Sequence, residues 1–143
     1  MQNRFYVDTC IWRDLFEERK GGLVPLGEFA FLFFKNCVKY KCIIVISSFV
    51  LFELKKAFSQ NDINSSLEPF LDVIEFVDIS YNKIERLFLK QGNIIGVHNE
   101  DITHALIAKE FNCVLITRDK HFDSLVGIVS VLAPEEVDFD NLY

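Results

Sequence analysis

The sequence lacks any apolar stretch approaching the roughly 20 uninterrupted residues that a helix needs to span a bilayer. Residues 1–4 lead directly into a strand-like run, without the apolar segment of a secretion signal. We therefore expect a cytoplasmic protein that does not enter the membrane.

The sequence also lacks the cysteine and histidine spacings that hold zinc. Its four cysteines are scattered, with no Cys-x-x-Cys pair and no matching histidine pair. Each lies within or beside an apolar segment, where free cysteine is commonly buried. The pattern favours buried free thiols at Cys10, Cys37, Cys42 and Cys113.

Positive charge is also scarce. The net charge is −6 and the pI is about 5.0. This balance argues against nonspecific nucleic-acid binding through overall positive charge. It does not exclude an enzyme that acts on nucleic acid, because bound metal ions would offset a carboxylate cluster locally while basic residues at its rim meet phosphates.

The chain is rich in the apolar residues that form a hydrophobic core. Half of its 143 residues are hydrophobic and 15 are Phe. A chain of this length buries roughly two-thirds of the surface that its unfolded form exposes. We expect a single domain that spans residues 1–143.

Short apolar runs alternate with segments of helical spacing. Five β-branched runs are typical of parallel strands buried on both faces: Phe5–Val7, Ile43–Ile46, Phe76–Ile79, Val114–Thr117 and Ile128–Leu132. Helices are predicted at Ile11–Arg19, Leu26–Lys41, Ser48–Phe58, Leu67–Val73, Asn82–Gln91 and Glu100–Phe111, with the polar tract Ser59–Ser66 as a connection. The alternation predicts a three-layer α/β/α domain around a central parallel sheet of four to five strands.

Four acidic residues occur where such a fold would bring them together. Asp8 and Asp119 each follow an apolar strand, and ligands bind at the carboxyl edge of an open parallel sheet. Glu53 borders the apolar stripe of one helix, and Asp101 lies in the first turn of another. Unpaired charges in apolar surroundings are costly, so we predict a cation site. Oxygen ligands favour Mg²⁺ or Mn²⁺ over zinc.

Each acid also has a purely structural explanation. Asp8 and Asp119 are well placed to act as helix N-caps. Asp101 is favoured by the helix dipole whether or not it binds a ligand, in a helix that Asn99 would cap. Taken singly these explanations compete closely with a metal site; taken together, the four positions favour the site.

Glu53 and the residues near the acids also have structural explanations. Glu53 has a structural alternative as a partly buried acid paired with Lys56. His104 shares a helix face with Asp101, but a lone helix histidine is more often structural than catalytic. Asp123 lies one turn after Asp119 and is predicted to be exposed.

These residues resemble the motifs of the PIN-domain family, in particular the VapC-type toxin ribonucleases. The matching pieces are Val7-Asp8-Thr9, Ser48 through Leu54 with Glu53, Asp101-Ile102-Thr103-His104-Ala105-Leu106-Ile107-Ala108 and Ile116-Thr117-Arg118-Asp119-Lys120-His121-Phe122. Their order and spacing extend over nearly the whole chain.

The resemblance implies a PIN fold with one acidic pocket. It implies that Asp8, Glu53, Asp101 and Asp119 bind Mg²⁺ or Mn²⁺ and are the catalytic residues. Thr9 and Thr117 are implied as supporting polar groups. The expected activity is hydrolysis of an RNA phosphodiester by a metal-bound water. Where the family often has a further Asp two residues after the fourth acid, this chain has His121, which argues against a second metal position.

The resemblance also implies partners: an RNA substrate, a small antitoxin and a second copy of the chain in a homodimer. Basic residues near the acids could contact the RNA backbone, although each is also an ordinary surface charge: Arg13, Lys55, Lys56, Arg118 and Lys120. Single-stranded or looped RNA suits sequence reading better than duplex. The Phe-rich helix within 28–41 offers an apolar surface, unless Phe29, Leu32, Phe33 and Val38 fill the core.

Two other functions compete with the ribonuclease. One is a PIN-like binding module with too little metal affinity for turnover, which His121 and the acidic surface favour. The other is a Mg²⁺-dependent phosphatase, but Asp8-Thr9-Cys10 lacks the Asp-x-Asp nucleophile motif that this class would need.

Overall fold

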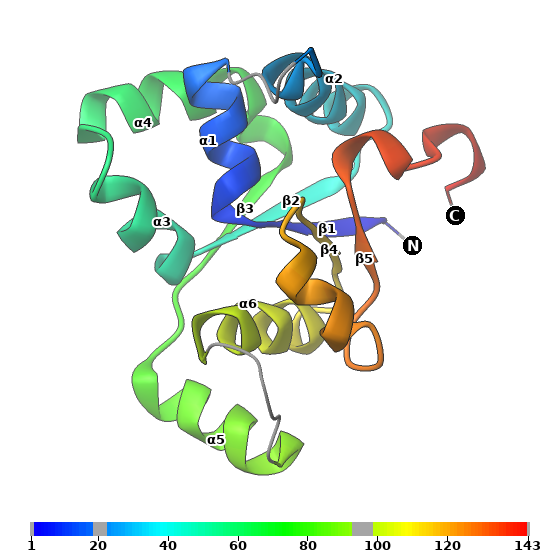
Figure 1. Cartoon of the computed structure of the whole chain (residues 1–143). Coiled ribbons are helices and arrows are strands. Elements are labelled where there is room, and N and C mark those ends of the chain that lie inside the picture. The colour runs from blue at the N-terminus through cyan, green and yellow to red at the C-terminus, as the bar shows by residue number, and fades with distance from the viewer. Residues whose placement is uncertain (1, 19–22, 93–98, 143) are drawn as a thin grey trace.

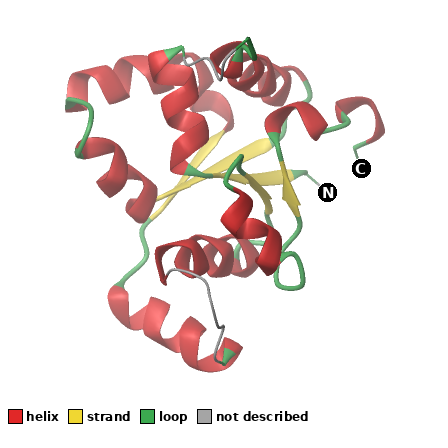
Figure 2. Ribbon diagram, viewed as in Figure 1, coloured by secondary structure: helices red, strands yellow, loops and turns green. Residues whose placement is uncertain are grey.

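The protein forms a five-stranded parallel sheet between helical layers (Figures 1 and 2). The computed structural model describes residues 2–18, 23–92 and 99–142. The strands are β1 (Arg4–Val7), β2 (Ile43–Ser47), β3 (Ile74–Val77), β4 (Val114–Ile116) and β5 (Val131–Leu132). The helices are α1 (Thr9–Glu17), α2 (Leu26–Lys39), α3 (Ser48–Lys55), α4 (Gln60–Leu67), α5 (Tyr81–Gln91) and α6 (Asn99–Glu110). Short 3-10 helices complete the chain: η1 (Glu68–Val73), η2 (Lys120–Leu125), η3 (Pro134–Glu136) and η4 (Phe139–Asn141).

The helices cover both faces of the sheet. Figure 1 shows α1 to α4 on one face, α6 on the other, and α5 on the outer side of α6. Seven consecutive residues of α6, Ile102–Ala108, are buried. A helix that is buried on every side needs apolar or small residues around its circumference rather than one stripe. This arrangement confirms the predicted α/β class with helices on both faces of a parallel sheet.

The strand order β3-β2-β1-β4-β5 creates a topological switch between β1 and β4. The chain moves from β1 through β2 to β3 on one side, and places β4 and β5 on the other. Crevices at the carboxyl ends of strands next to such a switch are where open α/β sheets bind ligands. Asp8 immediately follows β1, and its backbone N–H donates to the carbonyl of Ile116 at the end of β4, 2.9 Å away.

Aromatic rings pack together on the side of the core that α1, α2 and η1 share. Phe34 of α2 lies between Trp12 of α1, with ring centroids 4.5 Å apart, and Phe70 of η1, at 5.3 Å. On α2 the core contains Phe33 and Phe34, while Phe29 is half-buried. Leu32 and Val38 are exposed, so the core explains only part of this apolar helix.

Several predicted boundaries were wrong. The tract predicted as a polar connection contains α4, because the Ser59 hydroxyl caps the Asp62 N–H and the helix buries Ile63 and Leu67. The helix predicted after it is the 3-10 helix η1. Strand β3 begins at Ile74 rather than Phe76, since it pairs in register with β2 from Ile44 onward.

The remaining differences are smaller. Strand β5 contains only Val131 and Leu132 of the five residues predicted. Helix α3 ends at Lys55 rather than Phe58. Helix α6 begins at Asn99, so Asn99 is helical rather than the residue before the helix. The cysteines are free thiols, and all except the half-buried Cys10 are buried, as predicted. In the described ranges, no helix is both long enough and apolar enough to cross a bilayer.

Candidate functional site

Asp8 is a buried carboxylate at the end of β1. It has the extended backbone of an N-cap residue, and its Oδ1 accepts the N–H of Thr9 at 2.8 Å. Its Oδ2 accepts the Thr117 hydroxyl at 2.8 Å and lies 3.2 Å from the Cys10 thiol. Burial, and then the charge of Asp8, raise the pKa of Cys10 to about 12, so this thiol stays protonated and can donate. Asp8 therefore caps α1 and also faces the end of β4.

Glu53 reaches the same region from α3. Its Oε1 lies 2.7 Å from His104 Nε2, and its Oε2 accepts the Thr9 hydroxyl at 2.5 Å. Burial by itself would raise the pKa of Glu53, but the hydrogen bond and charge of His104 outweigh burial and lower the pKa. The predicted alternative was an ion pair with Lys56. The hydrogen-bond partners of Glu53 are instead His104 and Thr9, and the charge of Lys56 lowers the pKa of Glu53 less than His104 does.

Asp101 lies in the first turn of α6, with 18% of its side chain exposed. Burial raises the pKa of its carboxyl, and the negative charges of Asp119 and then Asp8 raise it further. This electrostatic coupling means that carboxylates far apart in the sequence share one local field. A cation among them would relieve the repulsion.

Asp119 follows β4 and caps η2. Its Oδ1 accepts the backbone N–H of His121 at 2.9 Å, and its own N–H donates to the Thr117 hydroxyl at 3.0 Å. Thr117 therefore joins the two strand-end acids, because the same hydroxyl donates to Asp8. The capping role predicted for Asp119 is confirmed, and it leaves the second carboxylate oxygen available.

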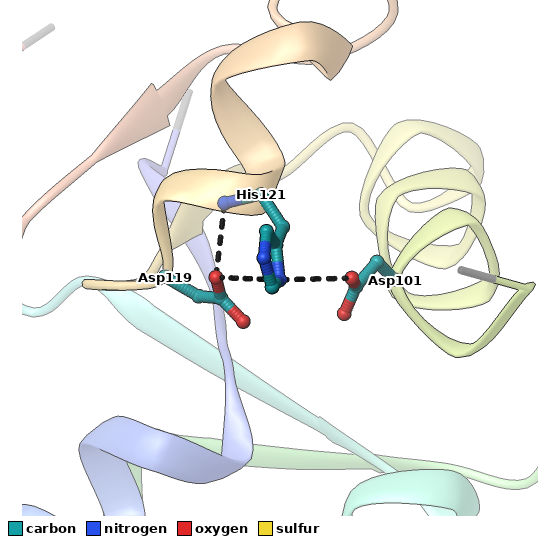
Figure 3. A group of neighbouring side chains, drawn as sticks. All are labelled: Asp101, Asp119 and His121. Carbon is teal, nitrogen blue, oxygen red and sulfur yellow. Dashed lines mark hydrogen bonds and ion pairs between the residues drawn. The ribbon is translucent and has the colours of Figure 1, made fainter. Parts of the chain in front are cut away.

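His121 stands between two of the acids (Figure 3). Its Nδ1 lies 3.2 Å from Asp119 Oδ1 and 3.9 Å from Asp101 Oδ2. One ligand atom from each of the three residues falls within a 4.8 Å span. In the PIN motifs His121 stands only as a departure from Asp; the structure places its imidazole inside the acidic group.

A second histidine lies deeper. His104 is 3% exposed, and its Nδ1 is 2.7 Å from the Tyr6 hydroxyl, which is itself 2.7 Å from the Ser47 hydroxyl. Burial lowers the pKa of His104, but Glu53 and Asp8 outweigh burial and raise the pKa. Neither Tyr6 nor Ser47 was selected from the sequence, because each lies within or beside an apolar strand that explains its burial.

The predicted substrate contacts differ in their surroundings. The Arg118 guanidinium makes two 2.7 Å bonds to Glu135 and lies 3.4 Å from Asp14. Arg13 pairs with Glu17 at 3.3 Å on an exposed face of α1. Lys120 is exposed on a cleft of about 330 Å³ that also contains Asp119. Asp123 is exposed on this cleft, as predicted.

A second cleft, of about 240 Å³, is lined by residues of α3, α5 and α6. Glu53 and His104 line it together with the exposed rings of Phe52 and Tyr81. Of the four acids, Asp119 lines the cleft beside η2 and Glu53 lines this second cleft.

Solved structures share this fold. A chain of VapBC2 from Rickettsia felis, bound to a DNA fragment from their promoter, matches with a TM-score of 0.60 and 23% identity, over 91% of this chain and 98% of that chain. FitAcB from Neisseria gonorrhoeae matches with a TM-score of 0.55 and 17% identity, over 93% and 99%. FitAB bound to an IR36 DNA fragment matches with a TM-score of 0.57 and 15% identity, over 94% and 97%.

No protein-family model and no curated protein sequence matches the chain. The likeness to the solved structures therefore establishes the fold, along almost the whole chain. The predicted α/β fold with a central parallel sheet, similar to these VapBC and FitAB chains, is confirmed.

Proposed function

We propose that this protein is a divalent-metal-dependent endoribonuclease of the PIN-domain type and the toxin of a toxin–antitoxin pair. The observation that carries the proposal is the gathering of Asp8, Asp101 and Asp119 into one electrostatic field beside the switch between β1 and β4. A fold shared with VapBC2 and FitAB chains supports the same reading.

The donor set fits a hard cation. Asp8, Glu53, Asp101 and Asp119 would hold Mg²⁺ or Mn²⁺ through carboxylate oxygens, which these ions prefer. When bound, the ion supplies an acidified water and neutralises charge on the phosphate oxygens. Burial, and then the negative charges of Asp119 and Asp8, raise the pKa of Asp101, and a cation would compensate the repulsion between these acids.

The chain's own hydroxyls orient the acids. Thr117 donates to Asp8 at 2.8 Å, and Thr9 donates to Glu53 at 2.5 Å. Each bond holds one oxygen of a carboxylate and restricts its rotation, which leaves lone pairs for the ion. Lys120 is the better placed of the predicted phosphate contacts, because Arg118 is already paired with Glu135.

The central experiment is an RNA cleavage assay. Structured and unstructured RNAs are incubated with the wild type and with Asp8→Asn, each in Mg²⁺, in Mn²⁺ and in EDTA. We expect cleavage with either metal, none in EDTA, and a loss in Asp8→Asn larger than the about 10–100-fold that the loss of an outer-shell partner costs. Cleavage that persists in EDTA, or an Asp8→Asn protein that cleaves as fast as wild type, contradicts the proposal.

The same assay separates the enzyme from the competing function. His121 stands where PIN enzymes often have Asp, which favours a binding module with little metal affinity. A wild-type protein that binds RNA but cleaves none with either ion supports the module instead.

The proposed toxin would bind an antitoxin and a second copy of itself. The solved VapBC2 and FitAB structures are complexes bound to DNA fragments, and by analogy this chain would pair with an antitoxin. The exposed apolar residues Phe31, Leu32 and Val38 of α2 form one surface that such a partner, or a second copy of the chain, could cover. Light scattering of the purified chain tests the homodimer directly: a monomer at all concentrations would rule it out.

A further inference from the structure

A buried chain of hydrogen bonds ends on Glu53. It begins at Ser47, passes through the Tyr6 hydroxyl to His104 Nδ1, and continues from His104 Nε2 to Glu53 Oε1. Each of these three distances is 2.7 Å. Ser47 and Tyr6 are fully buried and His104 is 3% exposed, so water does not compete for these groups.

The donors of this chain can be assigned by counting protons. The Val50 N–H donates to the Ser47 oxygen at 3.2 Å, so the Ser47 proton is available to the Tyr6 oxygen. The Tyr6 proton then meets His104 Nδ1, and the imidazole proton lies on Nε2 and is donated to Glu53. The opposite direction leaves the Ser47 proton without an acceptor among the residues that the structure describes, and an unsatisfied buried donor is costly.

We propose that Tyr6 and His104 are positioning residues that hold the Glu53 carboxylate in one orientation toward the metal ion. The inference rests on the proposed metal-dependent function and adds to it. Both carboxylate oxygens of Glu53 accept hydrogen bonds, one from His104 and the other from Thr9. The carboxylate therefore cannot turn about its own axis without breaking a hydrogen bond.

A ligand that is already oriented loses less freedom when it binds an ion. Outer-shell hydrogen-bond partners of metal ligands typically change metal affinity or activity by about 10–100-fold. Tyr6 contacts the imidazole of His104 and not Glu53 itself. Loss of its hydroxyl should therefore weaken metal binding less than loss of the imidazole does.

The test compares three variants with the wild type. His104→Leu removes the donor to Glu53. His104→Gln keeps an amide N–H near the position of Nε2, and Tyr6→Phe removes only the hydroxyl. Tyr40→Phe is the matched control, because the Tyr40 hydroxyl bonds exposed Asp140 instead. Mn²⁺ affinity is measured by titration calorimetry, and the ¹⁵N resonances of His104 are recorded by NMR in alkaline buffer.

We expect His104→Leu to bind Mn²⁺ about 10-fold or more weakly, and His104→Gln to recover most of the loss. Tyr6→Phe should weaken binding less and shift the Nδ1 resonance while the proton stays on Nε2. Tyr40→Phe should change neither reading. Melting curves verify that each variant is folded; if His104→Leu is unfolded, the Gln variant and Tyr6→Phe carry the test.

The inference is overturned if the Gln and Leu variants bind Mn²⁺ equally, or if the His104 proton is found on Nδ1. Absence of Mn²⁺ binding by the wild type overturns it as well. Failure of the proposed function has a different signature: the wild type binds Mn²⁺ with the expected order of variants but cleaves no RNA.

Discussion

At the scale of single residues, the acidic group shows how local rules and tertiary contacts act on the same side chain. Asp8 and Asp119 do cap helical segments, and the same carboxylates lie beside Thr117 at the switch of the sheet. Capping and ligation are compatible, because the two oxygens of a carboxylate have about four lone-pair sites and these hydrogen bonds do not occupy all of them. The sequence could identify these acids as candidates; it could not show that His121 joins them.

The charge of Asp101 should destabilise the metal-free protein. Its carboxyl pKa is raised in the folded state, so the folded form holds the proton more tightly than the unfolded form. The stability from this group is fully present below the ordinary carboxyl pKa and is lost as the pH rises through the raised pKa. At neutral pH and without metal, Asp101→Asn should therefore melt at a higher temperature than the wild type. Its RNA cleavage should fall by more than about 100-fold, which exceeds the loss caused by removing a hydrogen-bond partner of a metal ligand.

Calorimetric melting in EDTA at neutral and at acidic pH checks this prediction. The advantage of Asp101→Asn should shrink as the pH falls, since the wild-type carboxyl becomes protonated. Glu85→Gln, at an exposed position of α5, is a control for removing one negative charge. A variant that melts below wild type at neutral pH would contradict the role assigned to Asp101.

His121 should set the metal preference. Its Nδ1 shares a 4.8 Å span with Asp101 and Asp119 oxygens, and an imidazole nitrogen suits Mg²⁺ less well than a carboxylate does. We expect His121→Asp to raise the affinity for Mg²⁺ relative to Mn²⁺, because it replaces an imidazole nitrogen with a carboxylate oxygen. Titration calorimetry with each ion measures the ratio, with His121→Asn as the uncharged control; an unchanged ratio would place His121 outside the metal site.

At the scale of elements, the position where a helix starts depends mainly on residues that are close to it in the sequence. Ser47, Ser59 and Ser80 each accept a backbone N–H two or three residues into the following helix. The tract after Ser59 was nevertheless predicted as a loop, because its polar residues hide a helix whose buried side chains are only Ile63 and Leu67. These two side chains are buried only when α4 packs against η1, a contact that the sequence does not show.

Loss of the Ser59 cap should weaken α4. Ser59→Ala removes the oxygen that accepts the Asp62 N–H at 3.1 Å, and the loss of an N-cap typically costs about 1 kcal/mol. The free energy of unfolding, from urea denaturation, is the measurement. Ser65→Ala, at an exposed position of the same helix, serves as the control and should be neutral or slightly stabilising. Equal effects of the two substitutions would argue against the cap.

At the scale of the whole molecule, aromatic contacts join segments that are distant in the sequence. Phe34 bridges Trp12 of α1 and Phe70 of η1, so that α1, α2 and η1 share one side of the core. The sequence shows that phenylalanine is abundant, but it does not show which rings are inside. On α2, Phe33 and Phe34 are buried while Phe31 is 48% exposed.

Phe34→Ala should lower the free energy of unfolding by about 3–5 kcal/mol, because it leaves a cavity between three packed elements. Phe31→Ala, on the exposed face of the same helix, should change the free energy of unfolding of the monomer by no more than about 0.5 kcal/mol. Urea denaturation of both variants provides the comparison. A small effect at Phe34 would mean that the core closes around the deletion.

The sequence by itself determined the alternation of strands and helices and the identity of the acids, because apolar runs and acidic positions are properties of neighbouring residues. Only the tertiary structure decided which atoms meet. Tyr6 and His104 lie 98 positions apart, and Asp8 and Thr117 lie 109 apart. Hydrogen bonds over such separations depend on strand order and on side-chain directions, which are set when the whole core packs rather than by any local pattern.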